Sequence, residues 1–287
     1  MGNIVIGVPS HTSKATFSAD GGSWAAAYPV TNLGNLPLAR VARTTNALVA
    51  STKFLAVLDK DRPCRVFGLI DHNMTTTATF RLRLYSDVSA TALLYDTGVI
   101  DVWPTVYPYP GLEWEDDTYW TGKYTTEQIT GYRWTRPLWL PATYMTRAIR
   151  VELFDSGNPA GYLQLGRFEL AQGWQPTINY GFGASRGYRF RTAQVEALGG
   201  VSYFERRDKP RVFRGAIDYL PVAEGSVKAF EFLRQHDIDV PFLVIPDPDD
   251  TNEYLRNVFL ARNVNPGPLT TAMVGREQFP FEFHEVL

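Results

Sequence analysis

The chain has 287 residues, of which 45% are apolar and 20% charged, a composition typical of a folded globular protein rather than a disordered one. The formal net charge of −2 indicates neither a nucleic acid nor an anionic membrane as a partner. The single cysteine, Cys64, excludes an internal disulfide and a thiolate metal cluster, and no apolar run is long enough to cross a bilayer.

The first part of the chain has the pattern of short antiparallel strands. In residues 78–86, Phe80, Leu82 and Leu84 alternate with Arg81, Arg83 and Tyr85, which is the period of a half-buried strand. Similar runs lie at 54–59, 65–71, 147–155 and 162–170. Residues 101–131 form a long loop between them. We therefore predict a jelly-roll sandwich over residues 1–172.

The second part begins in the stretch 173–187, whose glycine, proline and asparagine content predicts a domain boundary. Further strands are predicted at 187–196, 211–220, 241–247, 254–262 and 279–286. A single helix is predicted over about 225–237, with Ser226 as its cap and apolar residues recurring at helical spacing. The prediction is a mainly β protein, in which residues 173–287 form a smaller β-domain with one helix.

The long loop contains the sequence WPTVYPYPGLEWEDDTYW at residues 103–120. Its three prolines remove ladder donors, so this stretch cannot be a central strand. Its aromatic rings could stack on a sugar whose hydroxyls the carboxylates accept, or anchor a protein interface, with some of them buried as a lid over the sandwich. The candidate contact residues are Trp103, Tyr107, Tyr109, Trp114, Tyr119 and Trp120.

Tests for catalytic motifs favour a protein that is not an enzyme. Residues 183–187 match G-x-S-x-G around Ser185, but the nucleophile elbow needs a helix after the serine, and an alternating strand follows instead. An esterase built on Ser185 is retained only as a minor alternative. The histidines are scattered, and His72 is expected at a strand end with a structural hydrogen bond. We predict no catalytic residue and no cofactor.

Two acidic clusters were considered as metal or glycosidase sites. Asp247, Asp249 and Asp250 lack the twelve-residue spacing of a calcium loop and predict a turn that the aspartate side chains cap. The four acids within 113–117 lie on one loop and cannot straddle a sugar substrate by themselves, so we expect a solvated loop, with a calcium site as the alternative. No sequence rule supports that alternative, and we predict no metal site.

Two stretches resemble a known class of proteins. Trp24, the P-x-x-N-L turn at 29–33, the strand at 39–44, the strand end at 57–59 and the pair His72-Asn73 resemble galactose-binding-like (discoidin-type) jelly rolls, in particular those of long-tailed bacteriophage (siphophage) tail proteins. Residues 211–250 and 279–287 resemble the ring-forming β-domain of distal tail or minor tail proteins. Pro241-Phe242 and Glu285-Val286 match, but residues 237–239 replace the glycine expected before Pro-Phe.

The resemblance covers about two thirds of the chain and implies a structural component of a phage tail tip or baseplate. It implies a virion protein, made in the host bacterial cytoplasm, that forms a homo-oligomeric ring, for which we expect six copies. The expected partners are the tail tube, the tape measure and hub or receptor-binding proteins. The alternative function is a carbohydrate-binding module for host-surface glycans, either attached to a virion or free.

Overall fold

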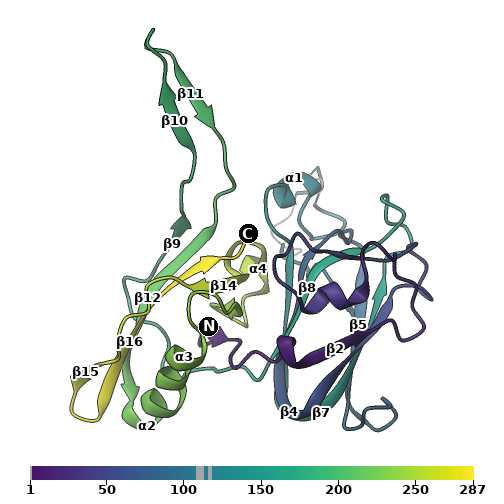
Figure 1. Cartoon of the computed structure of the whole chain (residues 1–287), viewed down its shortest axis with the longest axis horizontal. Coiled ribbons are helices and arrows are strands. Elements are labelled where there is room, and N and C mark those ends of the chain that lie inside the picture. The colour runs from purple at the N-terminus through teal and green to yellow at the C-terminus, as the bar shows by residue number, and fades with distance from the viewer. Residues whose placement is uncertain (1, 108–112, 116–117) are drawn as a thin grey trace. The chain divides into compact units, whose positions relative to one another are not determined.

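The chain is mainly β, as predicted, and its internal contacts divide it into two compact units (Figure 1). The computed structural model describes residues 2–107, 113–115 and 118–287. The first unit contains the described residues up to Gln175 together with Phe242–Phe259, and the second contains Pro176–Pro241 and Leu260–Leu287. The chain therefore leaves the first unit, forms part of the second, and returns to the first before completing the second.

The first unit is built from antiparallel strands and short helical turns. Its strands are β1 (Val5–Ile6), β2 (Ala15–Ser18), β3 (Ala42–Arg43), β4 (Lys53–His72), β5 (Thr79–Tyr85), β6 (Leu93–Asp101), β7 (Thr135–Phe154), β8 (Gln164–Ala171) and β13 (Phe242–Ile245). Its short helices are α1 (Thr126–Ile129) and α4 (Tyr254–Asn257), with 3₁₀ turns at Thr12–Lys14, Val30–Gly34 and Thr251–Glu253.

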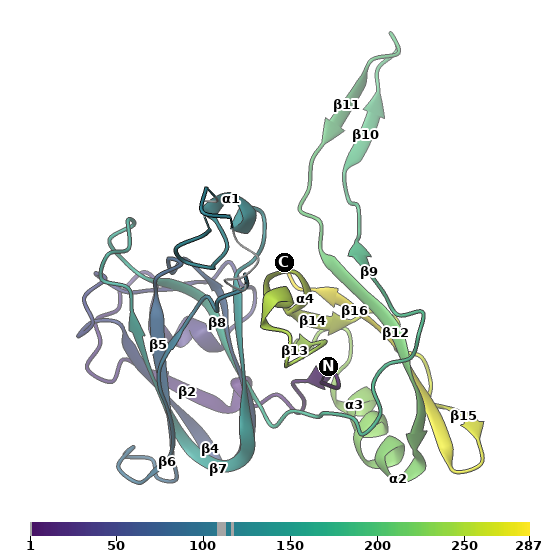
Figure 2. The same ribbon diagram turned by 180° about the vertical axis from the view of Figure 1, so that it is seen from behind.

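Two long strands, β4 and β7, form the frame of the sandwich (Figure 2). The first part of β4 pairs with β2 and with the end of β7, whereas its last part pairs with β8 and with the start of β7. Register shifts between Val57 and Arg62 and between Cys64 and Val66 allow this change, because bulges bend a strand. The predicted strand end at 57–59 is therefore wrong: β4 continues through it.

A close-packed aromatic cluster occupies the interior of the sandwich. Phe17, Phe54, Phe67 and Phe168 are buried, and the ring centroids of Phe54 and Phe168 lie 5.3 Å apart in an edge-to-face arrangement. Such pairs are favourable beyond the area they bury, by about 0.5–1.5 kcal/mol. The apolar positions that alternate along β4, β5 and β7 supply the rest of this core, as the period-two pattern predicts.

The second unit contains a sheet, a helical segment and a projecting hairpin. Its strands are β9 (Ser185–Tyr188), β10 (Ala193–Glu196), β11 (Ser202–Glu205), β12 (Arg211–Pro221), β14 (Phe259–Asn263), β15 (Thr270–Met273) and β16 (Arg276–Glu285). β12 lies between β9 and β16, and β16 also pairs with β14 and β15. Phe213, Phe279 and Phe283 are buried in this sheet, and the rings of Phe279 and Phe283 pack with Phe232 from the helical segment.

The helical segment differs from the prediction at its start. It comprises α2 (Val222–Glu224), a π-helical turn (Gly225–Ala229) and α3 (Phe230–Gln235). Ser226 lies inside this segment and does not cap it, because the segment begins after Pro221. A Cβ at Gly225 would lie 1.9 Å from a side-chain oxygen of Glu277, so a larger residue here would require that carboxylate to move.

The strand predicted at 254–262 is also partly wrong. Residues 254–257 form helix α4, and the strand β14 begins only at Phe259. Asp250 caps the start of the 3₁₀ turn Thr251–Glu253 by accepting a hydrogen bond from Asn252 N at 3.2 Å, and Asp247 accepts from Asp249 N at 3.0 Å. The prediction of an aspartate-capped turn is confirmed.

Candidate interaction surfaces

Trp103, the first residue of the aromatic loop, belongs to the core of the sandwich. Its side chain is 6% exposed, and its indole N–H donates to the Met74 carbonyl at 3.1 Å. Its ring centroid lies 5.2 Å from that of Trp134 and 5.7 Å from that of His72. Trp103 is therefore one of the residues that pack beneath the loop, and it presents no outward surface.

His72 ends strand β4 and is buried between these two tryptophans. Burial, together with the charge of Arg136, lowers its pKa to about 3, so the imidazole is neutral at physiological pH. Its Nδ1 accepts a hydrogen bond from Met74 N at 3.4 Å. The strand end and the structural hydrogen bond expected for His72 are both confirmed.

Trp114 and Trp120 lie on the outer part of the loop and are 71% and 85% exposed. Tyr107 and Tyr119 are half-buried; the Tyr119 ring packs edge-to-face against that of Trp120 at 5.1 Å. Tyr109 lies outside the described residues. Of the predicted contact residues, Trp114 and Trp120 thus offer the largest open aromatic surface.

The base of the loop is held in place by polar contacts. The backbone N–H groups of Val106 and Tyr107 donate to the Gly122 carbonyl at 2.8 and 3.0 Å, and Lys123 forms an ion pair with Asp101 at 3.0 Å. The Thr125 side chain caps α1 in a reciprocal capping box with Gln128. The exposed tryptophans therefore stand on an anchored base.

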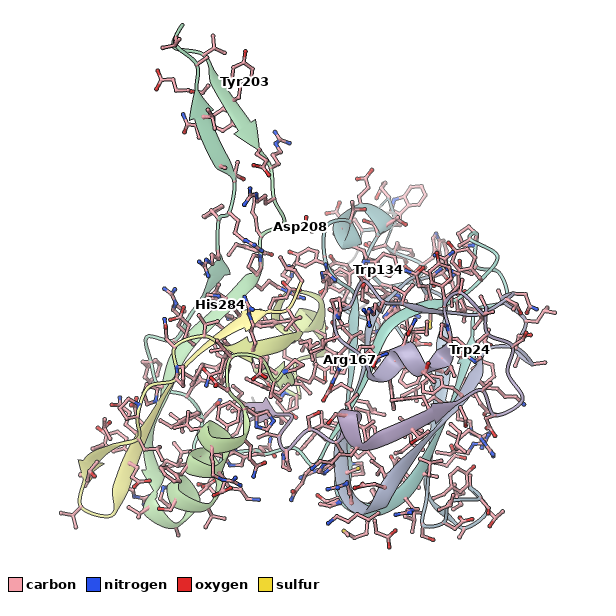
Figure 3. The ribbon with its side chains drawn as sticks, in the orientation of Figure 1. Trp24, Trp134, Arg167, Tyr203, Asp208 and His284 are labelled. Atoms are coloured by element: carbon pink, nitrogen blue, oxygen red, sulfur yellow. The ribbon has the colours of Figure 1, made fainter. Side chains whose placement is uncertain are left out.

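A second surface, which the sequence did not identify, is the hairpin of residues 189–209, here called the arm. Figure 3 shows it standing away from the sheet of its own unit, with Tyr203 toward its far end and Asp208 toward its root. β10 pairs with β11 from Ala193 opposite Glu205 to Glu196 opposite Ser202. At the far end, Ala197 N donates to the Val201 carbonyl at 2.9 Å, and Gly200 has a φ of +80°, as a three-residue hairpin loop requires.

No residue of the arm is buried. The register places five small or apolar side chains on one side of the ladder, here called the arm face: Ala193, Val195, Ala197, Val201 and Tyr203. Tyr203 is 64% exposed, and Phe204, Phe190 and Leu198 are exposed elsewhere on the arm. A hairpin of this kind presents large apolar side chains to solvent along most of its length.

By contrast, the root of the arm is held by a backbone hydrogen bond and a buried ion pair. Arg189 N donates to the Pro210 carbonyl at 3.0 Å, and Arg211, the next residue, begins β12. The Arg211 guanidinium forms an ion pair with Glu285 at 2.6 Å, in which both side chains are almost fully buried. Glu285 also accepts from Arg211 N at 3.0 Å. A buried, doubly hydrogen-bonded pair fixes the point from which the arm projects.

One feature of the sequence indicates the arm. Ala197-Leu198-Gly199-Gly200-Val201 is a glycine turn between two alternating runs, which is a hairpin signal. The predicted strand at 187–196 covered only β10 and part of β9 and left its partner, β11, without an assignment. Exposure of the whole hairpin is a tertiary property that alternation alone does not reveal.

The residues considered for catalysis are not arranged as a nucleophile elbow. Ser185 begins β9, pairs with Arg214 across the ladder, and is followed by strand rather than helix. His284 lies on β16 with its Nε2 2.7 Å from a carboxylate oxygen of Glu282. Although burial opposes ionisation, hydrogen bonds from His284, Asn265 and Arg214 lower the pKa of Glu282 to about 2. These contacts assign His284 and Glu282 a structural role in the sheet of the second unit.

Within the described ranges, no group of three or more histidine, cysteine, aspartate or glutamate side chains is placed to hold a metal ion. In the same residues, no helix is long and apolar enough to cross a bilayer.

Comparison with known proteins finds similarity at the level of the fold. No protein-family model matches the chain, and no curated protein matches its sequence. A family 32 carbohydrate-binding module from C. perfringens NanJ in complex with galactose is similar to 58% of this chain and 98% of its own, with 10% identity and a TM-score of 0.37. A fucose-binding module of Streptococcus pneumoniae covers 55% of this chain and 89% of its own, with 14% identity and a TM-score of 0.33. A chitosan-binding module from a Paenibacillus chitosanase/glucanase covers 56% and 97%, with 11% identity and a TM-score of 0.34.

Proposed function

We propose that the chain is a structural subunit of a homo-oligomeric assembly and that the arm is buried against a neighbouring protein when the assembly forms. The observation that carries the proposal is the arm itself, in which no residue is buried although several are large and apolar. From the sequence resemblance, we further propose that this assembly is the tail tip or baseplate of a long-tailed bacteriophage, with six copies in its ring.

The energetics of an isolated hairpin support this proposal. A two-stranded hairpin is marginally stable in water, because it cannot bury enough apolar surface to offset the entropy of ordering its chain. On the arm face, Val195 lies opposite Tyr203, and both remain open to solvent. Contiguous exposed apolar side chains of this kind mark interaction sites in soluble proteins.

The sheet edges are a second supporting feature. β6 forms one edge of the sheet in the first unit, and it exposes Leu93, Leu94 and Val99. An edge strand leaves a row of backbone donors and acceptors without strand partners, and proteins cover such edges or blunt them with charge. A ring of identical subunits covers edges and projecting arms with neighbouring copies. The proposed partners beyond the ring are those that the resemblance implies, namely the tail tube, the tape measure and hub or receptor-binding proteins.

The proposal is tested by replacing residues 190–209 with Asn-Gly. Arg189 and Pro210 already pair, so a two-residue turn closes β9 onto β12 without disturbing the buried root. In sedimentation velocity, the native chain is expected to associate as concentration rises, and the arm-replaced chain is expected to stay monomeric.

The matched control substitutes Met273 and Val274 with serine, because these are exposed apolar residues at another hairpin end of the same unit. Its association is expected to be that of the native chain. A native chain that remains monomeric at every concentration would contradict the proposal.

A second candidate function is the binding of host-surface glycans, and Trp114 and Trp120 are the observation that favours it. Two tryptophans exposed at 71% and 85% on the anchored loop of a jelly-roll sandwich could stack on sugar rings. In a glycan array, this function predicts binding that disappears on changing both tryptophans to alanine and persists in the arm-replaced chain. Loss of assembly in the alanine variant, without any glycan binding by the native chain, would exclude it.

A further inference from the structure

The arm is positively charged around its apolar face. Residues 189–209 contain five lysine or arginine residues and three acidic ones, whereas the whole chain has 28 basic and 30 acidic residues. The excess of acids therefore lies outside the arm. The cations gather near the root: Arg189 and Arg191 on one side of the hairpin, and Arg206, Arg207 and Lys209 on the other.

Aromatic rings lie among these cations. Lys209 Nζ lies 5.3 Å from the ring centroid of Phe190, and Phe204 and Tyr203 lie farther from the root on β11, the returning strand of the hairpin. One arginine is already engaged, since Arg207 forms an ion pair with Glu205 at 2.9 Å. The arm therefore offers guanidinium groups next to open apolar surface, and a complementary partner would combine carboxylates with aromatic rings.

The loop of the first unit has that complementary chemistry. From Trp103 to Gly122 the sequence contains four acids and no lysine or arginine. Among the described residues of this stretch, Glu113, Trp114, Glu115 and Trp120 are exposed. Guanidinium groups bind carboxylates through paired hydrogen bonds and stack on indole faces, and tryptophan is the best aromatic partner for a cation.

We infer that the arm of one copy docks on the exposed described residues of the acidic tryptophan loop, Glu113, Trp114, Glu115 and Trp120, of a neighbouring copy. This inference rests on the proposed function and names the two surfaces through which the copies meet. Because the surfaces differ, the contact is heterologous: each copy presents an arm to one neighbour and a loop to the other. Repetition of such a contact closes a ring when the rotation between copies divides the circle, as a tail-tip ring requires.

A nucleic acid is a poorer fit to the arm than a second copy. The arm carries Glu196, Glu205 and Asp208 beside its cations, and like charge would repel phosphates. Its arm face is made of small and apolar side chains, which offer a phosphate backbone no favourable contact. A protein surface with both acids and indole rings fits both parts of the arm.

Charge exchange tests the inference. One variant carries Arg189→Glu, Arg191→Glu and Arg206→Glu on the arm, and a second carries Glu113→Lys and Glu115→Lys on the loop. Each variant alone is expected to lose at least about tenfold in association, because three new acids on the arm then face the acidic loop, or two new lysines on the loop then face the arginines of the arm. An equimolar mixture of the two variants is expected to recover association. The changed arm of the first variant then meets the changed loop of the second, and the native arm of the second meets the native loop of the first.

A chain with both sets of changes is expected to associate by itself. The control is Arg234→Glu, an exposed arginine on α3, which is expected to leave association unchanged. Thermal unfolding confirms that each variant is folded, and recovery in the mixture shows it independently.

A disulfide test identifies which chains meet. Chains with Arg191→Cys and Glu115→Cys, carrying different tags, are expected to form a disulfide between the two tags; Cys64 is buried and does not compete. A third chain carries both introduced cysteines. If a disulfide forms only within this chain, and none forms between the two tagged chains, docking between copies is contradicted. Unchanged association in both charge variants would overturn this inference and leave the assembly proposal standing, whereas a monomeric native chain would remove both. Retention of an oligonucleotide by the native arm, without self-association, would also overturn it.

Discussion

Tyr203 is the residue of the arm face whose removal should separate assembly from folding most clearly. A buried tyrosine side chain covers roughly 150–250 Å². Because Tyr203 is 64% exposed in the single chain, about 130 Å² of it is open for burial by a neighbour. At about 25 cal/mol per Å², and allowing for the polar hydroxyl, this burial is worth about 2 kcal/mol per contact. Tyr203→Ala is therefore expected to weaken association by about 30-fold.

The same change should hardly affect folding. The single chain loses only the pair with Val195 across the hairpin, worth roughly 0.2–1 kcal/mol, and this pair lies outside the cores of both units. Sedimentation velocity measures the association, and thermal unfolding measures the stability. Phe230→Ala is the matched control, because Phe230 is an exposed aromatic residue of the same unit. An unchanged dissociation constant for Tyr203→Ala would refute the assignment of the arm face as an interface.

Three further predictions concern residues that the structure places in the interior. Trp103→Ala should reduce the free energy of unfolding by about 3–5 kcal/mol in chemical denaturation, whereas Trp120→Ala should change it by less than about 0.5. Folding lowers the pKa of His72 to about 3, so on acidification the unfolded chain binds a proton at this residue before the folded chain does. Between pH 6 and 4, the free energy of unfolding of the native chain should therefore fall by about 2 kcal/mol more than that of the His72→Gln variant. Arg211→Met should reduce the free energy of unfolding by about 3–5 kcal/mol, because it leaves the buried Glu285 carboxylate without its ion-pair partner. Adding Glu285→Leu should restore most of that stability, and no recovery in the double variant would contradict the account of the arm's root.

The period-two pattern was sufficient to predict a mainly β chain and most of its core. Phe80, Leu82 and Leu84 alternate inward as expected, because burial of one face is a local property of a strand. The continuity of β4 was missed. The apolar alternation of β4 is interrupted by three exposed charged residues, Asp59, Lys60 and Asp61. Only the pairing with β7 shows that the strand continues beyond them.

The candidate surfaces were predicted less completely. Composition singled out the aromatic loop, but it could not separate buried Trp103 from exposed Trp120, because this difference depends on packing against His72 and Trp134. The helix start was misplaced because serine is a common cap, whereas here the chain turns at Pro221 and Ser226 falls inside the segment. The arm has an ordinary hairpin sequence, and its significance lies in the exposure of every large side chain along it.

Electron microscopy of the purified native chain, at a concentration where sedimentation shows association, tests the assembly proposal most directly. The account predicts closed rings, six copies in each, with the arm of every copy in contact with Glu113–Glu115 and Trp120 of the next. Isolated monomers, or rings in which the arms point freely into solvent, would contradict it.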